Sequence, residues 1–159
     1  MDQDSRIAVR LITTAETWPL RQSELRPGWP LAAAQFPGDD LPSTRHFGAF
    51  QSDELVGIAS LFLAEMPEHP GVSALQLRGM ATAMAVRGAG FGRALVVACV
   101  AFTSASGKQL IWCNARNSAV EFYRKLGWEI LGAEFDVPDV GPHFHMWRRV
   151  AAAPAAETE

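Results

Sequence analysis

The chain has 159 residues, of which 48% are hydrophobic and 19% charged, and its formal net charge is −3. This length suits a single domain with a substantial core, and the composition excludes a chain that is mostly disordered. Lysine and arginine total 14 and form no run, so we expect no nucleic-acid partner. No apolar stretch reaches the roughly 18 residues that a membrane helix needs, so we expect no membrane contact either.

The N-terminus and the cysteines bear on the compartment and on metal binding. Residues 1–5 are acidic and polar where a signal peptide would be basic and then apolar, which indicates a cytoplasmic protein. Cys99 and Cys113 each lie in an apolar run, with no second cysteine or histidine at ligand spacing. We therefore expect two small buried side chains, without a disulfide or a metal.

The N-terminal part of the chain mixes regular and irregular segments. Residues 6–12 place isoleucine, valine and leucine at every second position, which predicts a strand. A short helix should follow, capped by Thr14 or Thr17, and it should end where prolines and glycines accumulate in residues 26–42. That stretch allows at most one helical turn, at residues 31–35. Long irregular segments in compact domains are commonly functional.

The middle of the chain predicts three strands and a long helix. Residues 46–50 and 55–65 have the pattern of paired strands, and residues 74–82 alternate between two faces of a third. Apolar residues then recur at i, i+4 and i+7 over residues 91–105, which predicts a helix that Gly107 ends.

The C-terminal part should complete the sheet. Residues 108–113 are continuously apolar, as in a strand covered on both faces. Residues 119–126 carry an apolar stripe at helical spacing, and a glycine follows them. Residues 128–131 and 143–150 are expected to be closing strands, and residues 151–159, which are alanine, proline and acid, a disordered tail.

A glycine-rich turn, Arg-Gly-Ala-Gly-Phe-Gly at residues 87–92, joins the predicted strand at residues 74–82 to the predicted helix at residues 91–105. The first N–H groups of a helix have no partner within the helix, and the helix dipole adds positive charge there, so such a turn suits an anion. It lacks the Lys-Ser/Thr pair of a phosphate-binding P-loop and the Gly-x-Gly-x-x-Gly spacing of a dinucleotide site. By itself it is either an anion site or only a tight connection.

Two segments together resemble the motifs of one family. Arg-x-x-Gly-x-Gly at residues 87–92 resembles motif A of the GCN5-related N-acetyltransferase (GNAT) family, Arg/Gln-x-x-Gly-x-Gly/Ala. Residues 117–128 resemble its motif B, Asn-x-x-Ala-x-x-Leu-Tyr-x-Lys-x-Gly-Phe, with the alanine one place early and a tryptophan for the final phenylalanine. The resemblance covers residues 6–150, and it implies that residues 1–150 form one N-acetyltransferase domain.

The resemblance implies an α/β fold: a mixed, mostly antiparallel sheet of six to seven strands, with the fourth and fifth splayed apart, flanked by about four helices. It also implies an enzyme that transfers an acetyl group from acetyl-CoA, as cosubstrate, to a primary amine of a small molecule or a peptide. The amine attacks directly in a ternary complex. The acceptor is not implied, and a monomer and a homodimer both stay open.

The resemblance also assigns cofactor-binding residues position by position. The backbone of the fourth strand would bind the pantetheine arm, and the amides of the glycine turn would bind the pyrophosphate. Two arginines would add charge, and two asparagines would contact the cofactor. The strand residues are Met80, Ala81 and Thr82, and the turn residues are Gly88, Ala89, Gly90, Gly92 and Arg93. The two arginines are Arg87 and Arg93, and the two asparagines are Asn114 and Asn117. The arginines have an alternative role as solvated turn residues, and Asn117 one as a helix N-cap.

Catalytic roles are assigned in the same way. Tyr123, the only tyrosine, matches the general acid that protonates the leaving thiolate, although it also fits the apolar stripe of its helix. A backbone N–H near Met80 would stabilise the oxyanion. Glu65 and His145 are candidate bases for the amine, with His143 on the same strand face as His145. Proton loss to water would need neither.

Two other functions stay open on the sequence alone. One is a non-catalytic acyl-CoA-binding or regulatory module on the same fold. The other is a partner-binding domain without CoA, for which the five tryptophans would supply an apolar surface.

Overall fold

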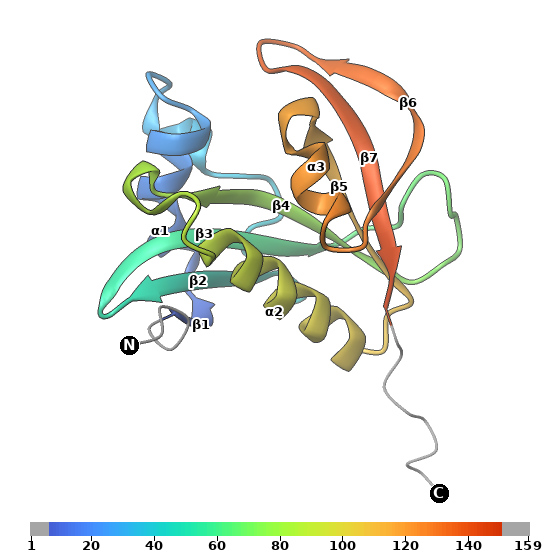
Figure 1. Ribbon diagram of the computed structural model, residues 1–159, viewed down its shortest axis with the longest axis horizontal. Helices are drawn as coiled ribbons and strands as arrows, with labels where there is room; N and C mark the ends of the chain where they lie inside the picture. Colours follow the sequence, from blue (N-terminus) through green and yellow to red (C-terminus); the bar gives the residue numbers. More distant parts are fainter. Residues whose placement is uncertain (1–6, 151–159) are drawn as a thin grey trace, which may run out of the picture. The chain divides into compact units, whose positions relative to one another are not determined.

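The computed structural model describes residues 7–150, so Arg6 and the expected tail at 151–159 lie outside the described residues (Figure 1). The elements, in chain order, are β1 (Ile7–Ile12), α1 (Thr14–Leu20), the π-helical turn η2 (Arg21–Leu25), the 3-10 turn η3 (Leu31–Ala34), β2 (Arg45–Gln51), β3 (Glu54–Leu63), β4 (Ala74–Thr82), the 3-10 turn η4 (Met84–Val86), α2 (Phe91–Ala105), β5 (Leu110–Arg116), the 3-10 turn η5 (Asn117–Ala119), α3 (Val120–Arg124), β6 (Glu129–Val137) and β7 (Gly141–Arg149).

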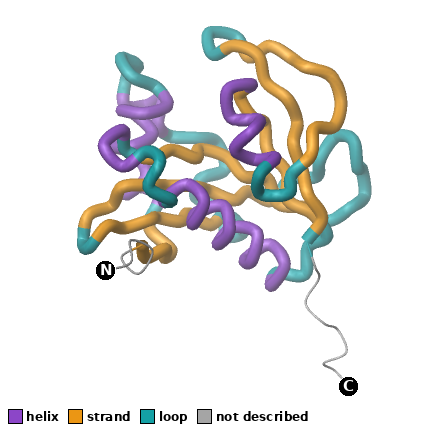
Figure 2. Tube along the Cα trace, in the orientation of Figure 1, coloured by secondary structure: helices purple, strands orange, loops and turns teal. Residues whose placement is uncertain are grey.

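The strands form a seven-stranded sheet in the order β1-β2-β3-β4-β5-β7-β6, and the tube in Figure 2 separates them from the helices by colour. β1 with β2, β2 with β3, β5 with β7 and β6 with β7 are antiparallel, whereas β4 and β5 are parallel. The parallel pairing joins Ala74–Leu77 to Leu110–Cys113. The mixed, mostly antiparallel α/β sheet is thus confirmed, with three α-helices rather than about four.

The contacts divide the chain into two compact units. The first unit contains the residues up to Phe62 together with Arg78–Cys99, and the second contains Leu63–Leu77 and the residues from Val100 onward. In the first unit α2 packs on β3, since a Cβ at Gly57 would lie 3.0 Å from the Leu95 side chain. Leu95 is fully buried there, as its place on the predicted apolar stripe requires.

The first helix begins one residue earlier than the sequence suggested. Thr13, not Thr14 or Thr17, is the N-cap: its side chain accepts from the Glu16 N–H, and the Glu16 carboxylate accepts from the Thr13 N–H at 2.7 Å. This reciprocal capping box satisfies two amides that the helix leaves unpaired. Thr17 is instead buried and donates to the Thr14 carbonyl.

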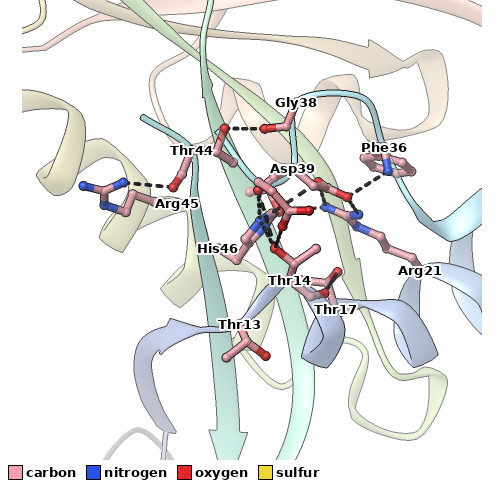
Figure 3. A network of polar contacts seen from close by, with 12 residues as sticks. Thr13, Thr14, Thr17, Arg21, Phe36, Gly38, Asp39, Thr44, Arg45 and His46 are labelled. Atoms are coloured by element: carbon pink, nitrogen blue, oxygen red, sulfur yellow. Dashed lines mark hydrogen bonds and ion pairs between the residues drawn. The ribbon is translucent and has the colours of Figure 1, made fainter. Parts of the chain in front are cut away.

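A buried ion pair orders the proline- and glycine-rich stretch that follows α1 (Figure 3). Both Nη atoms of Arg21 donate to the Asp39 carboxylate, at 2.7 and 3.0 Å, and the Phe36 N–H donates to the same carboxylate at 2.8 Å. His46 contacts the Asp39 carbonyl through Nε2 at 3.0 Å. The stretch is therefore fixed by long-range polar contacts, although its composition predicts only loops and one turn.

The second unit has its own apolar core, formed by Met66, Ala74, Leu110 and Trp112. The Trp112 Nε1–H donates to the Ala64 carbonyl at 2.9 Å, so this large buried side chain leaves no polar atom unsatisfied. Cys113 in this unit and Cys99 in the first are both buried and unbridged, as expected, and burial raises the pKa of each thiol.

The closing hairpin is longer than the sequence predicted. β6 and β7 extend to a turn at residues 138–140, where Asp139 has a positive φ of 66°. Turn-forming residues hide the alternation here, and a bulge between Leu131 and Phe135 shifts the register. Cross-strand packing extends both strands in spite of these turn-forming residues, because the Phe135 and His143 rings stack at 5.9 Å.

Candidate functional site

The glycine turn lies in the first unit, after the short turn η4 that separates it from β4. Gly88 and Gly90 have φ of +85° and +97°, a region that side chains disfavour. The Ala94 N–H donates to the Gly90 carbonyl at 3.0 Å, so the amides of Gly92 and Arg93 precede the hydrogen bonds of α2. A Cβ at Gly88 would meet no atom of residues 7–150 within 4 Å. The turn therefore offers oriented amides and open space, which fits a phosphate group.

Ala89 differs from its neighbours in this turn. Its N–H donates to the Val86 carbonyl at 3.1 Å, so this amide holds the turn together. The expectation that it binds pyrophosphate meets a competing hydrogen bond that the sequence did not reveal. Of the five amides predicted to bind pyrophosphate, those of Gly88, Gly90, Gly92 and Arg93 are the better candidates.

The two arginines of the turn have different surroundings. Arg87 forms an ion pair with Glu24, with 2.6 Å between Nη2 and Oε1, and its side chain is 52% exposed against 14% for Glu24. Arg93 is exposed and has no hydrogen-bond or ion-pair partner among residues 7–150. Arg93 is thus a solvated cation, whereas Arg87 already balances a carboxylate.

Met80, Ala81 and Thr82 close β4 in the first unit. The parallel pairing of β4 with β5 involves only Ala74–Leu77, so these three residues follow the paired part of the strand. The Ala83 N–H donates to the Val56 carbonyl at 2.8 Å, which anchors this end of β4 to β3. Met80 and Thr82 are partly buried, and Ala81 is buried.

Tyr123 lies in the second unit and is 6% exposed. Its ring contacts those of Phe122 and Trp128 at centroid distances of 5.1 and 4.9 Å. Burial raises the pKa of the Cys113 thiol, and a side-chain hydrogen bond with Tyr123 opposes that rise. The tyrosine is therefore both a core side chain and a polar group held in one position, so the two roles that its sequence position allowed are compatible.

The two asparagines are exposed, and one expectation about them is wrong. Asn114 lies within β5, opposite His145 on β7. Asn117 is the first residue of η5 and does not cap α3, whose N-cap is Ala119 without a side-chain hydrogen bond. The 3-10 turn places three residues between the strand and the helix, so Asn117 is too far from the first α-helical amides to cap them.

His145 and Glu68 form a pair that the sequence did not predict. Glu68 lies in the turn between β3 and β4, and its Oε2 and Oε1 lie 2.7 and 2.9 Å from His145 Nδ1. The two side chains are 19% and 27% exposed, so the pair is only partly shielded from water. Nε2 of His145 has no hydrogen-bond partner among the described residues. No local pattern marks Glu68, because 77 residues separate it from His145.

Aromatic rings surround this pair. Trp112 contacts the His145 ring edge-on at 5.4 Å, and Phe135 contacts it at 4.9 Å. Phe135 also stacks on His143, which confirms that the two histidines share one face of β7. His143 itself is buried, with Nδ1 2.8 Å from the Gly141 carbonyl. His145 is the more accessible of the two imidazoles.

Tyr123 and His145 lie on opposite faces of the β5–β7 pair. Cys113 and Asn114 are consecutive in β5, so their side chains point to opposite faces. Tyr123 hydrogen-bonds to Cys113, and His145 is the cross-strand partner of Asn114. The second unit therefore presents a phenol on one face and an imidazole–carboxylate pair on the other.

Glu65, the other candidate base, does not end a strand as expected. β3 ends at Leu63, and Glu65 lies in the turn beyond it, exposed, where its carboxylate accepts from the Gly71 N–H at 3.0 Å.

The described residues hold no group of three or more His, Cys, Asp or Glu side chains arranged for a metal ion. Within residues 7–150, no helix has the length and apolar character that crossing a membrane requires.

Comparisons with known proteins extend this description. The family model of the acetyltransferase (GNAT) domain matches residues 33–147. Over 142 residues the chain is 34% identical to the uncharacterized N-acetyltransferase YitI of Bacillus subtilis (strain 168), which covers 89% of this chain and 95% of that protein.

Solved structures share the fold at low sequence identity. NAA60 of Arabidopsis thaliana, in complex with a bisubstrate analogue, has a TM-score of 0.72 at 11% identity, over 92% of this chain and 99% of that one. An aminoglycoside 6′-N-acetyltransferase complexed with coenzyme A has a TM-score of 0.72 at 16% identity, over 92% and 99%. The family model and the relative of 34% identity agree with this fold and with both sequence motifs. The chain belongs to the GNAT family and is an acetyltransferase.

Proposed function

We propose that the protein transfers the acetyl group of acetyl-CoA to a primary amine, which attacks the thioester directly in a ternary complex. The observation that carries this proposal is the open glycine turn at the start of α2, with positive φ at Gly88 and Gly90 and space above Gly88. A pyrophosphate needs oriented amides and room to approach the backbone, and this turn supplies both. A related fold that binds coenzyme A lends further support.

In the proposed reaction the amine nitrogen bonds to the thioester carbonyl carbon and the carbon–sulfur bond breaks. Coenzyme A leaves as a thiol, and the amine becomes an amide. The amine must lose a proton, since a lysine-like amine has a pKa of about 10.4, and the leaving thiolate must gain one.

We propose that Tyr123 donates the proton that the leaving thiolate gains, and that His145 accepts the proton that the amine loses. The Glu68 carboxylate accepts from Nδ1–H of His145, and in the neutral ring this leaves the lone pair of Nε2 as acceptor. Glu65 is the weaker candidate base, since an amide proton already occupies its carboxylate.

Two measurements test the proposal. A saturating concentration of acetyl-CoA should raise the melting temperature, since a ligand at 100 times its Kd adds about 2.7 kcal/mol of stability. Thiol release should then follow when amines are added. The variant Tyr123→Phe keeps the ring and removes the hydroxyl, so turnover should fall by about a hundredfold or more while acetyl-CoA binding is kept.

Different failures of this test have different meanings. Unchanged turnover in Tyr123→Phe would remove this residue from the mechanism. Stabilisation by acetyl-CoA without thiol release across a broad amine panel would contradict catalysis. No stabilisation at all would contradict the assignment of the glycine turn.

A further inference from the structure

The first unit contains a cationic and aromatic group that the proposed reaction does not use, which we call the Arg78 cluster: Arg21, Arg26, Phe36, Phe62 and Arg78. Arg78 lies on β4, where it is partly buried, and its Cζ is 5.2 Å from the Phe36 ring centroid and 5.0 Å from that of Phe62. Arg21 contacts Phe36 as well, with Cζ 3.8 Å from the centroid. The aromatic rings thus hold the Arg78 guanidinium in place.

The charges within this cluster do not balance. Asp39 is its neighbouring carboxylate, and both of its oxygens accept from Arg21. Among the described residues, Arg78 has no hydrogen-bond acceptor and no carboxylate partner. Burial lowers the pKa of Arg78, repulsion from Arg21 and Arg26 adds to this, and Asp39 opposes it. A partly buried cation without a partner is costly, and an anion beside it would offset that cost.

The shape of the group selects the kind of anion. A guanidinium presents parallel N–H groups that match a carboxylate in two hydrogen bonds. Aromatic contacts to Phe36 and Phe62 restrain the plane of Arg78, so less freedom is lost when a carboxylate binds. Such a planar, restrained cation suits a planar anion with two oxygen atoms, such as a carboxylate.

The position of Arg78 on β4 relates it to the reaction. Arg78 and Met80 lie two residues apart on β4, so their Cα atoms are at most about 7 Å apart. Gly79 between them has a φ of +63°, which interrupts the alternation of the strand at this point. The family resemblance assigns stabilisation of the developing oxyanion to a backbone N–H near Met80. Because Arg78 and Met80 belong to one short segment of β4, a carboxylate on Arg78 and an amine at the thioester could belong to the same small molecule.

From this geometry we infer that the acceptor is a small amine that also carries a carboxylate, and that Arg78 binds the carboxylate. The inference rests on the proposed function for its reaction, and on the Arg78 cluster for its specificity. It names a substrate class, an amino acid with a reactive amine, and assigns Arg78 as the residue that determines this specificity.

The test compares matched acceptors with and without a carboxylate charge, and Arg78→Gln controls for the lower basicity of the amine in each amide. Thiol release from acetyl-CoA is measured with a panel of α-amino acids and β-alanine, and with the C-terminal amide of each. For the acceptors that are used, kcat/KM should favour the carboxylate over its amide by about ten- to a hundredfold, the range of a charge-assisted pair. The variant Arg78→Gln should abolish this preference by raising KM for the carboxylate, and Arg78→Lys should retain part of it.

A control and a binding measurement make the test decisive. Arg10, whose Cζ lies 4.0 Å from the Phe50 centroid, is an exposed arginine with the same kind of aromatic contact, and Arg10→Gln should leave the preference unchanged. Calorimetry on the CoA-loaded protein compares N-acetylleucine with its amide. In the wild type the carboxylate should bind more tightly than the amide, and in Arg78→Gln this difference should disappear.

The outcomes separate the two proposals. Acetylation of amides as readily as of carboxylates would overturn the role of Arg78 and leave the acetyl transfer intact. Binding of neither acetylated probe, together with no preference in turnover, would also overturn it. Loss of stabilisation by acetyl-CoA in the wild type would instead contradict the proposed function.

Discussion

Two acid–base pairs in this protein, Arg21–Asp39 in the first unit and His145–Glu68 in the second, differ in how completely they are used. The side chains of Arg21 and Asp39 are 0% and 6% exposed, and both Asp39 oxygens accept from Arg21. The side chains of His145 and Glu68 are 19% and 27% exposed, and one imidazole nitrogen has no partner among residues 7–150. A buried pair whose carboxylate oxygens are both engaged serves the fold, although Nε of Arg21 has no hydrogen-bond partner among the described residues. A pair with an unused polar atom at an accessible position is instead suited to chemistry.

The largest effect should come from the buried pair. Asp39→Asn leaves Arg21 buried without its counter-charge, which should lower the free energy of unfolding by about 3–5 kcal/mol at neutral pH. Urea unfolding measures this loss. Asp40→Asn is the matched control, because Asp40 is exposed and accepts only a single hydrogen bond from Thr14, so its loss should stay below about 1 kcal/mol.

The same pair should make stability depend on pH. Burial alone would raise the pKa of Asp39, yet hydrogen bonds from Arg21 and from the Phe36 amide, with the charge of Arg21, hold the pKa below its ordinary value of 3.8. A carboxylate with a lowered folded pKa stabilises the protein above its unfolded pKa, and this contribution is lost as the pH falls through the folded value. The difference between wild type and Asp39→Asn should therefore shrink on acidification below pH 3.8. A constant difference would contradict the ion pair.

The accessible pair should affect rate rather than stability. Glu68→Gln removes the charge that orients and polarises His145, so kcat should fall by about tenfold or more with KM nearly unchanged. Glu65→Gln changes the same residue type in the same turn, and it should leave kcat as it is. Steady-state kinetics with one acceptor measures both. Equal effects of the two substitutions would remove the distinction between a catalytic pair and a surface carboxylate.

A fourth prediction concerns a site made of backbone amides alone. Gly88→Ala and Gly71→Ala replace glycines with φ of +85° and +82°, and at both positions the new Cβ meets no described atom within 4 Å. The conformational strain, of about 1–2 kcal/mol, should be similar in the two variants. Only Gly88→Ala should also raise the Kd for acetyl-CoA, by about tenfold, because its methyl group occupies the space of the phosphate. Calorimetry measures the Kd for acetyl-CoA of both variants. An equal loss of affinity in Gly71→Ala would argue against the turn as a phosphate site.

The smallest effect concerns the ion pair at the edge of that turn. Glu24→Gln removes the partner of Arg87, which leaves this cation to the phosphates. Because partly exposed ion pairs contribute about 0–1 kcal/mol, the Kd for acetyl-CoA should fall by no more than about threefold, and less at high salt. Weaker binding in Glu24→Gln would instead show that Glu24 holds Arg87 in its binding position.

The sequence by itself determined the features that depend on local backbone preference. The strand at Ala74–Thr82 and the helix at Phe91–Ala105 have the predicted bounds, and the glycine turn between them has the positive φ angles that its composition predicts. One family motif lies in this glycine turn and the other in residues 117–128, and together they indicated the family that the family model shows. Thr13 as N-cap and the 3-10 turn at Asn117 show the limit, since boundaries shift by a residue when neighbouring groups compete for the same amides.

Only the tertiary structure decided which charged groups meet. Glu68 lies 77 residues from His145, and Asp39 lies 18 from Arg21. The unpartnered guanidinium of Arg78 likewise depends on Asp39 being occupied by Arg21. Strand register and loop placement set these contacts, and no spacing along the chain records them. That is the physical reason why the sequence indicated the proposed acetyl donor through a glycine turn, while the inferred acceptor depends on how distant side chains pack.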